Sequence, residues 1–237
     1  MLNATENESV AFFYCERICR YSMDYEFIIK ILPLYNEAAM LTLKIGIIGI
    51  IFAIIIGLVL TIITFYQVPV LRNINKFYIE LSRNTPLLIQ LFFIYYGLPK
   101  VGISIKAEMC AILGLAFLGG SYMAETFRSG IEAIDVIQKE SAYILGFSKL
   151  QTIIYIIMPQ AIRVSLHGII ANIIFLLKET SVFSAISIMD LMFTAKDLIG
   201  IYYNTIEALL MLVLFYIIIL LPVSIIGILI ERKMKYV

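Results

Sequence analysis

The sequence predicts an all-α membrane protein with about five transmembrane helices. Of its 237 residues, 62% are hydrophobic and 15% are charged, and the mean hydropathy is +0.97. Soluble domains average about half apolar and about a quarter charged residues, and here the apolar excess falls into separate blocks. A polytopic membrane chain is therefore predicted. The net charge of +1 gives no basic field that would favour a nucleic-acid partner.

Five apolar runs are the predicted spans, at residues 38–66, 86–98, 109–124, from 161 onward, and 209–230. As a helix, the first run reaches about 43 Å, longer than the ~30 Å hydrocarbon core, so it tilts or projects. The second reaches only about 20 Å, which requires its flanking residues to be immersed as well. Thr85 as N-cap with Pro86 at the first helical position predicts the start of this second helix, and Pro99 predicts its end.

Residues 1–37 predict a polar tail that precedes a transmembrane domain at residues 38–237. The tail lacks the basic start and the apolar run of a signal peptide. Its acidic residues are Glu6, Glu8, Glu16, Asp24, Glu26 and Glu37. A surface helix is predicted near residues 25–34, and Pro33 is expected to disturb it.

The cysteines and the one histidine do not predict a metal site. Cys15, Cys19, Cys110 and His167 do not match any zinc-ligand spacing. Cys15 and Cys19 are spaced to share a helix face, although two ordinary tail cysteines are the simpler interpretation. We therefore predict that the chain is not itself an enzyme and that it holds neither a metal nor a cofactor.

The distribution of positive charge predicts the orientation, because short cytoplasmic loops carry an excess of Lys and Arg. With five spans, residues 67–85, the long loop after the third span and the C-terminus share one side of the membrane. That side carries ten Lys and Arg residues, against six on the side of the tail. The prediction is a multi-pass protein of the cytoplasmic membrane, with the N-terminal tail outside and the long loop and C-terminus inside.

The long loop, at about residues 128–160, is mixed in polarity. Charged residues at 132, 135, 139, 140 and 149 are spaced among apolar residues at 131, 134, 137, 142, 144 and 145, which is typical of short amphipathic helices. Gly146 can end the first helix in a left-handed conformation. Such a helix lies either on lipid or in a cleft of another protein. Because the charges are of both signs, they favour the protein cleft over an anionic lipid surface.

One motif in this loop resembles a known family. Glu140-Ser141-Ala142 is followed after three residues by Gly146, and Ile156 precedes Met158-Pro159 by one residue. The spacing resembles the EAA loop of the permease subunits of binding-protein-dependent ABC importers, with Ser141 and Met158 as mild departures. The stretches RNTPLLIQLFFIYYGLP, SYMAETFRSGIEAI, MPQAIR and LLKETS resemble the polar amino acid uptake subfamily, from about residue 38 to the C-terminus.

The resemblance implies the type I ABC importer permease fold and an alternating-access mechanism. Two permeases, as a homodimer or with a sister subunit, would form the pore, and partner ATPase subunits would bind and hydrolyse ATP. The chain itself has no glycine-rich phosphate loop. A solute-binding protein would deliver a polar amino acid from outside. The residues implied to couple the permease to the ATPase are Glu140, Ser141, Ala142, Gly146, Ile156 and Pro159.

Polar residues inside the membrane predict the substrate pathway, because such groups cost several kcal/mol unless they face a cavity or a partner. A zwitterionic amino acid needs a cation for its carboxylate and an anion or carbonyl groups for its ammonium. Lys178 and Glu179 offer this chemistry, although a structural ion pair at a broken helix explains them equally well. The predicted pathway residues are Asn172, Lys178, Glu179, Thr180, Ser181 and Glu125.

Two further interpretations stay open. Glu125 and Arg128 either line an inner gate or mark the membrane boundary, and Arg83, within a motif similar to the family's, has capping of the second span as its simplest role. The alternative function is an ion-coupled secondary transporter of a small polar solute, with Lys178 and Glu179 binding substrate or coupling protons. Inverted repeats of broken helices would support that class, and no internal repeat is evident in the sequence.

Overall fold

The computed structural model describes residues 23–65 and 69–235, and nearly all of them are helical. The helices in chain order are α2 (Tyr25–Phe65), α3 (Pro69–Arg83), α4 (Leu87–Phe92), η1 (Phe93–Gly97), η2 (Leu98–Val101), α5 (Ala107–Glu132), α6 (Val136–Ile144), α7 (Lys149–Gln151), η3 (Thr152–Ile157), α8 (Met158–Glu179), η4 (Thr180–Ile186), α9 (Leu191–Tyr202) and α10 (Thr205–Lys235). Of these, η1 and η3 are π-helical, and η2 and η4 are 3-10 helices. The tail cysteines lie outside the described residues.

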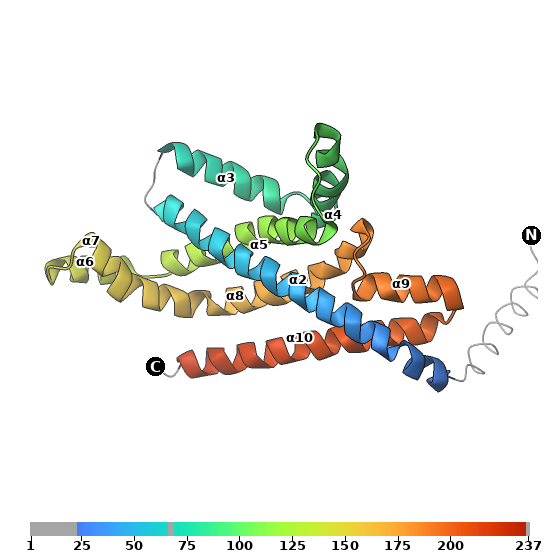
Figure 1. The fold of residues 1–237 in the computed structure, drawn as a ribbon. Coiled ribbons are helices and arrows are strands. Elements are labelled where there is room, and N and C mark those ends of the chain that lie inside the picture. The colour runs from blue at the N-terminus through green and yellow to red at the C-terminus, as the bar shows by residue number, and fades with distance from the viewer. Residues whose placement is uncertain (1–22, 66–68, 236–237) are drawn as a thin grey trace, which may run out of the picture.

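The four long helices α2, α5, α8 and α10 form an elongated bundle (Figure 1). In the described part of the chain, four helical stretches are long and apolar enough to cross a membrane: residues 25–64 in α2, 107–132 in α5, 149–186 from α7 to η4, and 205–234 in α10. Helix α5 packs mainly against α2 and α8, and α10 packs against α8 and α9. The largest core cluster joins fully buried residues of three of these helices, including Ile45, Leu115 and Leu176. Many large apolar side chains of α2 and α10 are exposed, as expected for helices that contact lipid or other membrane chains.

Glycines set how closely α2 and α5 approach. A Cβ atom at Gly57 of α2 would lie 2.5 Å from the Met123 Cβ and 2.9 Å from the backbone nitrogen of Ala124. On α5, a Cβ at Gly119 would lie 2.6 Å from the Cβ of Ala53. Small residues at such crossings let the two backbones come near enough for extensive van der Waals contact, which drives helix association in membranes.

We expect Gly57→Ala to lower the thermal unfolding temperature of the protein in detergent. The added methyl group meets backbone as well as side chain, so α2 and α5 must separate, an overpacking cost of about 1–3 kcal/mol. Gly200→Ala on α9 is the matched control, because nothing lies within 4 Å of a Cβ there. The control should melt at the wild-type temperature or slightly above it, and an equal loss in both variants would contradict the packing argument.

Helix α2 begins earlier than predicted and passes through Pro33 without ending. The sequence places a disturbed surface helix near residues 25–34 and the span from 38, but the structure has one helix of 41 residues. Tertiary contacts explain the difference, because the N-terminal part of α2 packs on α9 and α10. The Tyr35 hydroxyl donates a 2.6 Å hydrogen bond to the Ala208 carbonyl, and the ring of Phe27 lies edge-on against Tyr202.

The region of the second predicted span differs most from expectation. Residues 69–83, expected as part of a polar loop, form α3, which lies beside α2 and α5, and the chain then turns sharply into the short α4 (Figure 1). The predicted N-cap is also wrong. Pro86 is the N-cap residue of α4 and makes no side-chain cap, while the Thr85 hydroxyl donates to the Leu81 carbonyl of α3. Because α3 runs up to this point, its terminal carbonyls take the threonine hydroxyl.

The remaining helices extend the predicted spans. Helix α5 continues eight residues beyond the expected end at 124, and α10 covers the predicted 209–230 and continues at both ends. The fourth run breaks where the sequence shows no clear exit: α8 ends at Glu179, η4 follows, and Ser187 has a left-handed φ of 60°. Asp190 then caps α9, its side chain accepting a 2.8 Å hydrogen bond from the Phe193 nitrogen.

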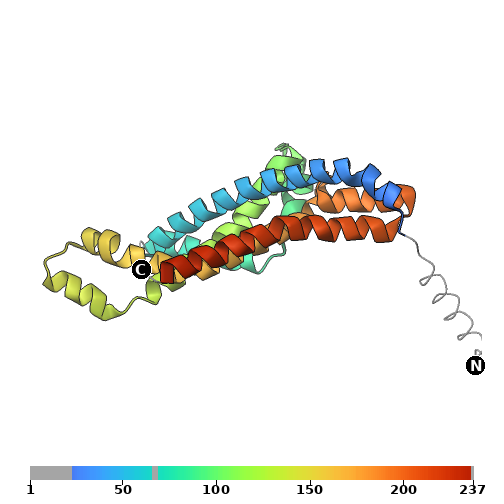
Figure 2. The ribbon, with the colours of Figure 1, turned by 90° about the horizontal axis from the view of Figure 1, so that it is seen from below.

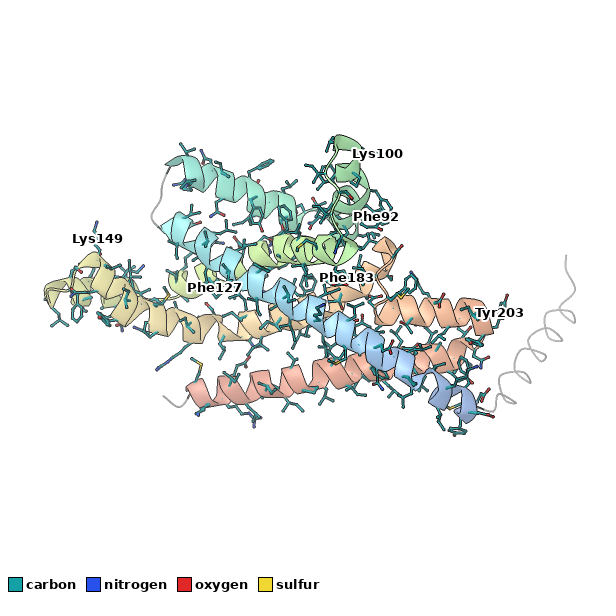
Figure 3. The ribbon with its side chains drawn as sticks, in the orientation of Figure 1. Phe92, Lys100, Phe127, Lys149, Phe183 and Tyr203 are labelled. Carbon is teal, nitrogen blue, oxygen red and sulfur yellow. The ribbon has the colours of Figure 1, made fainter. Side chains whose placement is uncertain are left out.

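Residues 133–157 form a projecting loop that extends beyond the bundle at the end where α10 finishes (Figure 2). Figure 3 shows Lys149 on this loop, Tyr203 at the opposite end of the molecule and Phe183 between them. The base of the loop is held by a small cluster of the buried Ile134, Ile157 and Ala161. The fold is the all-α membrane architecture that the sequence predicts. The second predicted span differs, because residues 87–101 form short apolar helices that are not among the four long stretches of the described chain.

Candidate functional site

Three cavities that contain charged side chains meet at Arg83 and Tyr122. The α3–α5 cavity, of about 550 Å³, and the α5–α8 cavity, of about 430 Å³, both also reach Glu125. The third, of about 340 Å³, lies where α3 gives way to α4 and where α8 ends, and is called the break cavity below. It reaches Glu179. Since Arg83 and Tyr122 line all three cavities, they lie at the junction between them.

Two helix breaks face the break cavity. The first is at residues 84–86, where Pro86 cannot donate a backbone hydrogen bond to α3. The Gln90 amide bridges this break by donating to the carbonyls of Ser82 and Thr85, at 3.0 and 2.9 Å. At the second break, after Glu179, the Thr180 hydroxyl donates a 2.7 Å bond to the Leu177 carbonyl. Hydroxyl groups that bind nearby carbonyls compete with helix hydrogen bonds, which accounts for the change to 3-10 geometry.

The charged side chains at the junction come from two helices, α3 and α5. A nitrogen of Arg83 lies 3.3 Å from the Glu125 carboxylate, and its guanidinium lies 5.1 Å from the centre of the Tyr122 ring. Glu125 also pairs with Arg128 at 2.9 Å, and Arg128 pairs with Glu132 at 2.7 Å. Glu125 is therefore held between two arginines, one on α3 and one on its own helix.

The structure brings some of the predicted pathway residues together and separates others. Glu125, Asn172 and Glu179 line the cavities. Lys178 is exposed and lines none of the three, and no salt bridge joins it to Glu179 within the described residues. Thr180 is fully buried and Ser181 is half-buried, so these two shape the second break.

Sequence reasoning missed the central residues of the site. It gave Arg83 a capping role and assigned nothing to Tyr122, which lies near the end of the third predicted span. A sequence signal for Arg83 does exist, because it is the last residue of a strongly amphipathic helix and is followed by a helix break at Pro86.

Among the described residues, no three His, Cys, Asp or Glu side chains are grouped closely enough to hold a metal ion.

The predicted coupling residues all lie on the projecting loop or at its return to the bundle. Glu140 and Ser141 are exposed on α6, while Ala142 is 1% exposed and anchors that helix. Gly146 has a φ of 83°, which confirms the predicted left-handed end of α6. Ile156, half-buried in η3, and Pro159, exposed in the first turn of α8, complete the motif.

The tip of the projecting loop presents an unusual amount of exposed apolar surface. Ile144 is 85% exposed and Leu145 is 74% exposed, next to Tyr143 and across from Leu150 and Tyr155, which are also exposed. Local caps hold this shape without help from the bundle. Asp135 caps α6, and Ser148 and Gln151 form a capping box at α7. A rigid apolar tip at one end of a membrane bundle is typical of a docking surface.

Comparison with known proteins identifies the family. Residues 27–236 match the model of the family described as "Binding-protein-dependent transport system inner membrane component". The chain is 36% identical over 217 residues to the probable amino-acid permease protein YxeN of Bacillus subtilis, covering 90% of this chain and 97% of that protein. It is 32% identical over 196 residues to the probable amino-acid ABC transporter permease protein PatM of Vibrio harveyi, covering 81% and 88% respectively.

A solved structure shares the fold. The structure described as "Crystal structure of an amino acid ABC transporter with histidines" superposes with a TM-score of 0.84 at 30% identity, covering 90% of this chain and all of that one. These relatives give no support to the secondary-transporter alternative and confirm the resemblance carried by the Glu140–Pro159 motif. The chain belongs to the family of binding-protein-dependent transport system inner membrane components, as the permease subunit of an ABC transporter.

Proposed function

We propose that this permease imports a polar amino acid across the cytoplasmic membrane, driven by ATP hydrolysis in a partner ATPase. The observation that carries the proposal is the junction of three cavities, lined in part by Arg83, Glu125 and Glu179, next to two helix breaks, in a chain whose relatives are named amino-acid permeases. An extracytoplasmic solute-binding protein delivers the substrate. A second permease, a copy of this chain or a sister subunit, completes the pore.

The projecting loop is the coupling loop and lies in the cytoplasm together with the C-terminus, while the N-terminus is outside. The excess of Lys and Arg on the loop's side supports this orientation. The exposed apolar tip around Ile144 and Leu145 supports docking into an ATPase cleft. Glu140, Ser141, Ala142, Gly146, Ile156 and Pro159 shape that contact. ATP is bound by the ATPase, and the permease itself holds no cofactor.

The substrate passes through the break cavity. Arg83 offers a cation for the amino acid's carboxylate, and Glu179 with the carbonyl groups at the two breaks offers acceptors for its ammonium. Carbonyl groups at helix breaks lack their usual helix partner, and a carbonyl that accepts one side-chain hydrogen bond keeps a second lone pair for a polar solute that loses its water. Thr180 and Ser181 maintain the second break, and Asn172 and Glu125 line the cavities that follow along α5 and α8. Lys178 belongs to this polar stretch but lies on its exposed side.

Alternating access requires a barrier that opens and closes, and the Arg83–Glu125 pair with Tyr122 is placed to provide it. These groups stand between the break cavity and the two other cavities. While Arg83 is held by Glu125 and stacked on Tyr122, the junction is filled. When the coupling loop moves with the ATPase, α5 moves relative to α3, and the pair separates.

Uptake by the complete complex in vesicles tests the function. Vesicles that contain the permease, its ATPase and the binding protein should accumulate a radiolabelled polar amino acid only when ATP is supplied on the side of the membrane that carries the ATPase. Thermal stabilisation of the binding protein by a ligand panel selects the substrate to use. Uptake that persists without ATP, or a purified permease that never retains an ATPase, would contradict the proposal.

We expect Glu179→Gln to reduce amino acid uptake about tenfold, because it removes the carboxylate that faces the break cavity and a charge-assisted hydrogen bond contributes about 1.5–3 kcal/mol. Lys178→Gln, one residue earlier on the exposed side, is the paired variant and should reduce uptake less. Initial rates across a range of substrate concentrations make the comparison. A larger loss of uptake in Lys178→Gln than in Glu179→Gln would show that Lys178, and not Glu179, is the charged residue that binds the substrate.

A further inference from the structure

We propose that α5 and α8 are locked together into a lever that carries the movement of the projecting loop to the Arg83–Tyr122 junction, and that Asn172 is the positioning residue of this lever. The proposal rests on the proposed function, since it concerns how ATP-driven movement reaches the cavities. It assigns to Asn172 a role in holding two helices, which is different from binding substrate.

In the part of the lever nearer the projecting loop, α5 and α8 cross so closely that they have no room to slide past each other. A Cβ atom at Gly130 of α5 would overlap the Ser165 side-chain oxygen of α8 and lie 2.7 Å from the Ala161 carbonyl oxygen. One turn further, a Cβ at Gly168 of α8 would lie 2.7 Å from the Thr126 methyl group. With glycine alternating between the two helices, each backbone rests on the other, and close-packed interiors move as units.

Hydrogen bonds between the same two helices fix the contact. The Ser165 hydroxyl donates to the Thr126 carbonyl at 3.2 Å. The Asn172 amide donates to the Thr126 hydroxyl at 2.8 Å and to the Tyr122 carbonyl at 3.3 Å. In a membrane, hydrogen bonds between helices add specificity to packing that the solvent does not drive. Asn172 thus ties α8 to the turn of α5 that carries Tyr122 and Glu125.

The two ends of the lever are the two functional regions. At one end, Ala161 belongs to the cluster with Ile134 and Ile157 that anchors the projecting loop. At the other end, the Asn172 bonds reach Tyr122, whose ring contacts Arg83. Contacts therefore run without a gap from the loop to the junction of the cavities. Displacement of a packed helix pair of this kind is a common way to transmit a change between distant sites.

The experiment compares Asn172→Leu with wild type in vesicles that contain the whole complex. Leucine keeps the four side-chain heavy atoms and their branching, but it cannot donate to Thr126 or Tyr122. We expect amino acid taken up per ATP hydrolysed to fall about tenfold, within the range by which residues between two sites alter their coupling. The KM for external amino acid with its binding protein should stay unchanged. A side chain that binds substrate would instead raise KM and keep the ratio.

Asn73→Leu is the matched control, because Asn73 is an exposed amide on α3 that lines none of the three cavities. It should leave the ratio at its wild-type value. Gly130→Ala tests the crossing by a different route and should lower the same ratio. An unchanged ratio in Asn172→Leu, or a raised KM with a constant ratio, overturns the lever. A wild-type complex without ATP-driven uptake overturns the proposed function as well, so the two failures are distinguishable.

Discussion

Gly146→Val should abolish most amino acid uptake while the complex continues to assemble. Gly146 has a φ of 83°, a conformation that costs a residue with a Cβ about 1–2 kcal/mol and a β-branched residue more. Valine would therefore unwind the end of α6 or turn the exposed Ile144 and Leu145 away from their present positions. Because this tip is the proposed ATPase contact, we expect ATP hydrolysis to continue with uptake reduced about tenfold or more.

Gly102 provides the control for backbone strain. It has a φ of 88° with nothing within 4 Å of a Cβ, as at Gly146, but it lies between η2 and α5, away from the projecting loop. Gly102→Val should therefore carry a similar conformational cost without a loss of coupling. Parallel measurements of uptake and ATP hydrolysis in vesicles distinguish the two variants. Normal coupling in Gly146→Val would remove this glycine from force transmission.

Glu125→Gln should also stop most transport, by weakening the barrier between the cavities. The carboxylate is 29% exposed and pairs with both Arg83 and Arg128, so its neutralisation leaves two arginines without their common counter-ion. A fully buried broken pair costs about 3–5 kcal/mol, and partial exposure reduces this to about 1–2 kcal/mol. We expect uptake to fall about tenfold, and ATP hydrolysis without substrate to rise, because the closed arrangement is no longer favoured.

Glu108→Gln is the matched control, because Glu108 of α5 pairs with Lys44 of α2 at 3.7 Å, is 55% exposed and lines none of the three cavities. Exposed pairs of this kind contribute about 0.2–1 kcal/mol, so uptake should change little. Initial uptake rates and substrate-free ATP hydrolysis, measured on the same preparations, give both quantities. If Glu125→Gln and Glu108→Gln behaved alike, Glu125 would be a membrane-boundary residue with no part in the barrier.

The polar side chains of this permease have two roles: some line the cavities, and others hold helices together. Arg83, Glu125 and Glu179 line the cavities, where a solute can reach them. Asn172 and Thr126 form a hydrogen bond with each other that joins α8 to α5. Asn172 and Glu179 lie seven residues apart in the same predicted span, so the sequence alone placed both in one pathway.

Hydropathy and local motif spacing were sufficient for the class of protein, for most of the helical runs and for the glycine that ends α6. These features depend on neighbouring residues: about twenty apolar residues are needed to cross the hydrocarbon core, and a glycine after an amphipathic helix ends it. For that reason the left-handed Gly146 could be predicted and was confirmed. Expectations that relied on local helix breakers alone were wrong where tertiary contacts overrode them, as at Pro33, where packing on α9 and α10 keeps α2 continuous.

The tertiary structure alone decided where the polar groups meet. Asn172 and Thr126 are 46 residues apart in the sequence, and Arg83 reaches Glu125 and Tyr122 from a different helix. No periodicity within one helix encodes such a meeting, because it depends on the angle and depth at which packed helices cross. Glycines at those crossings, such as Gly130 against Ser165, set that depth through atoms that only the folded chain brings together.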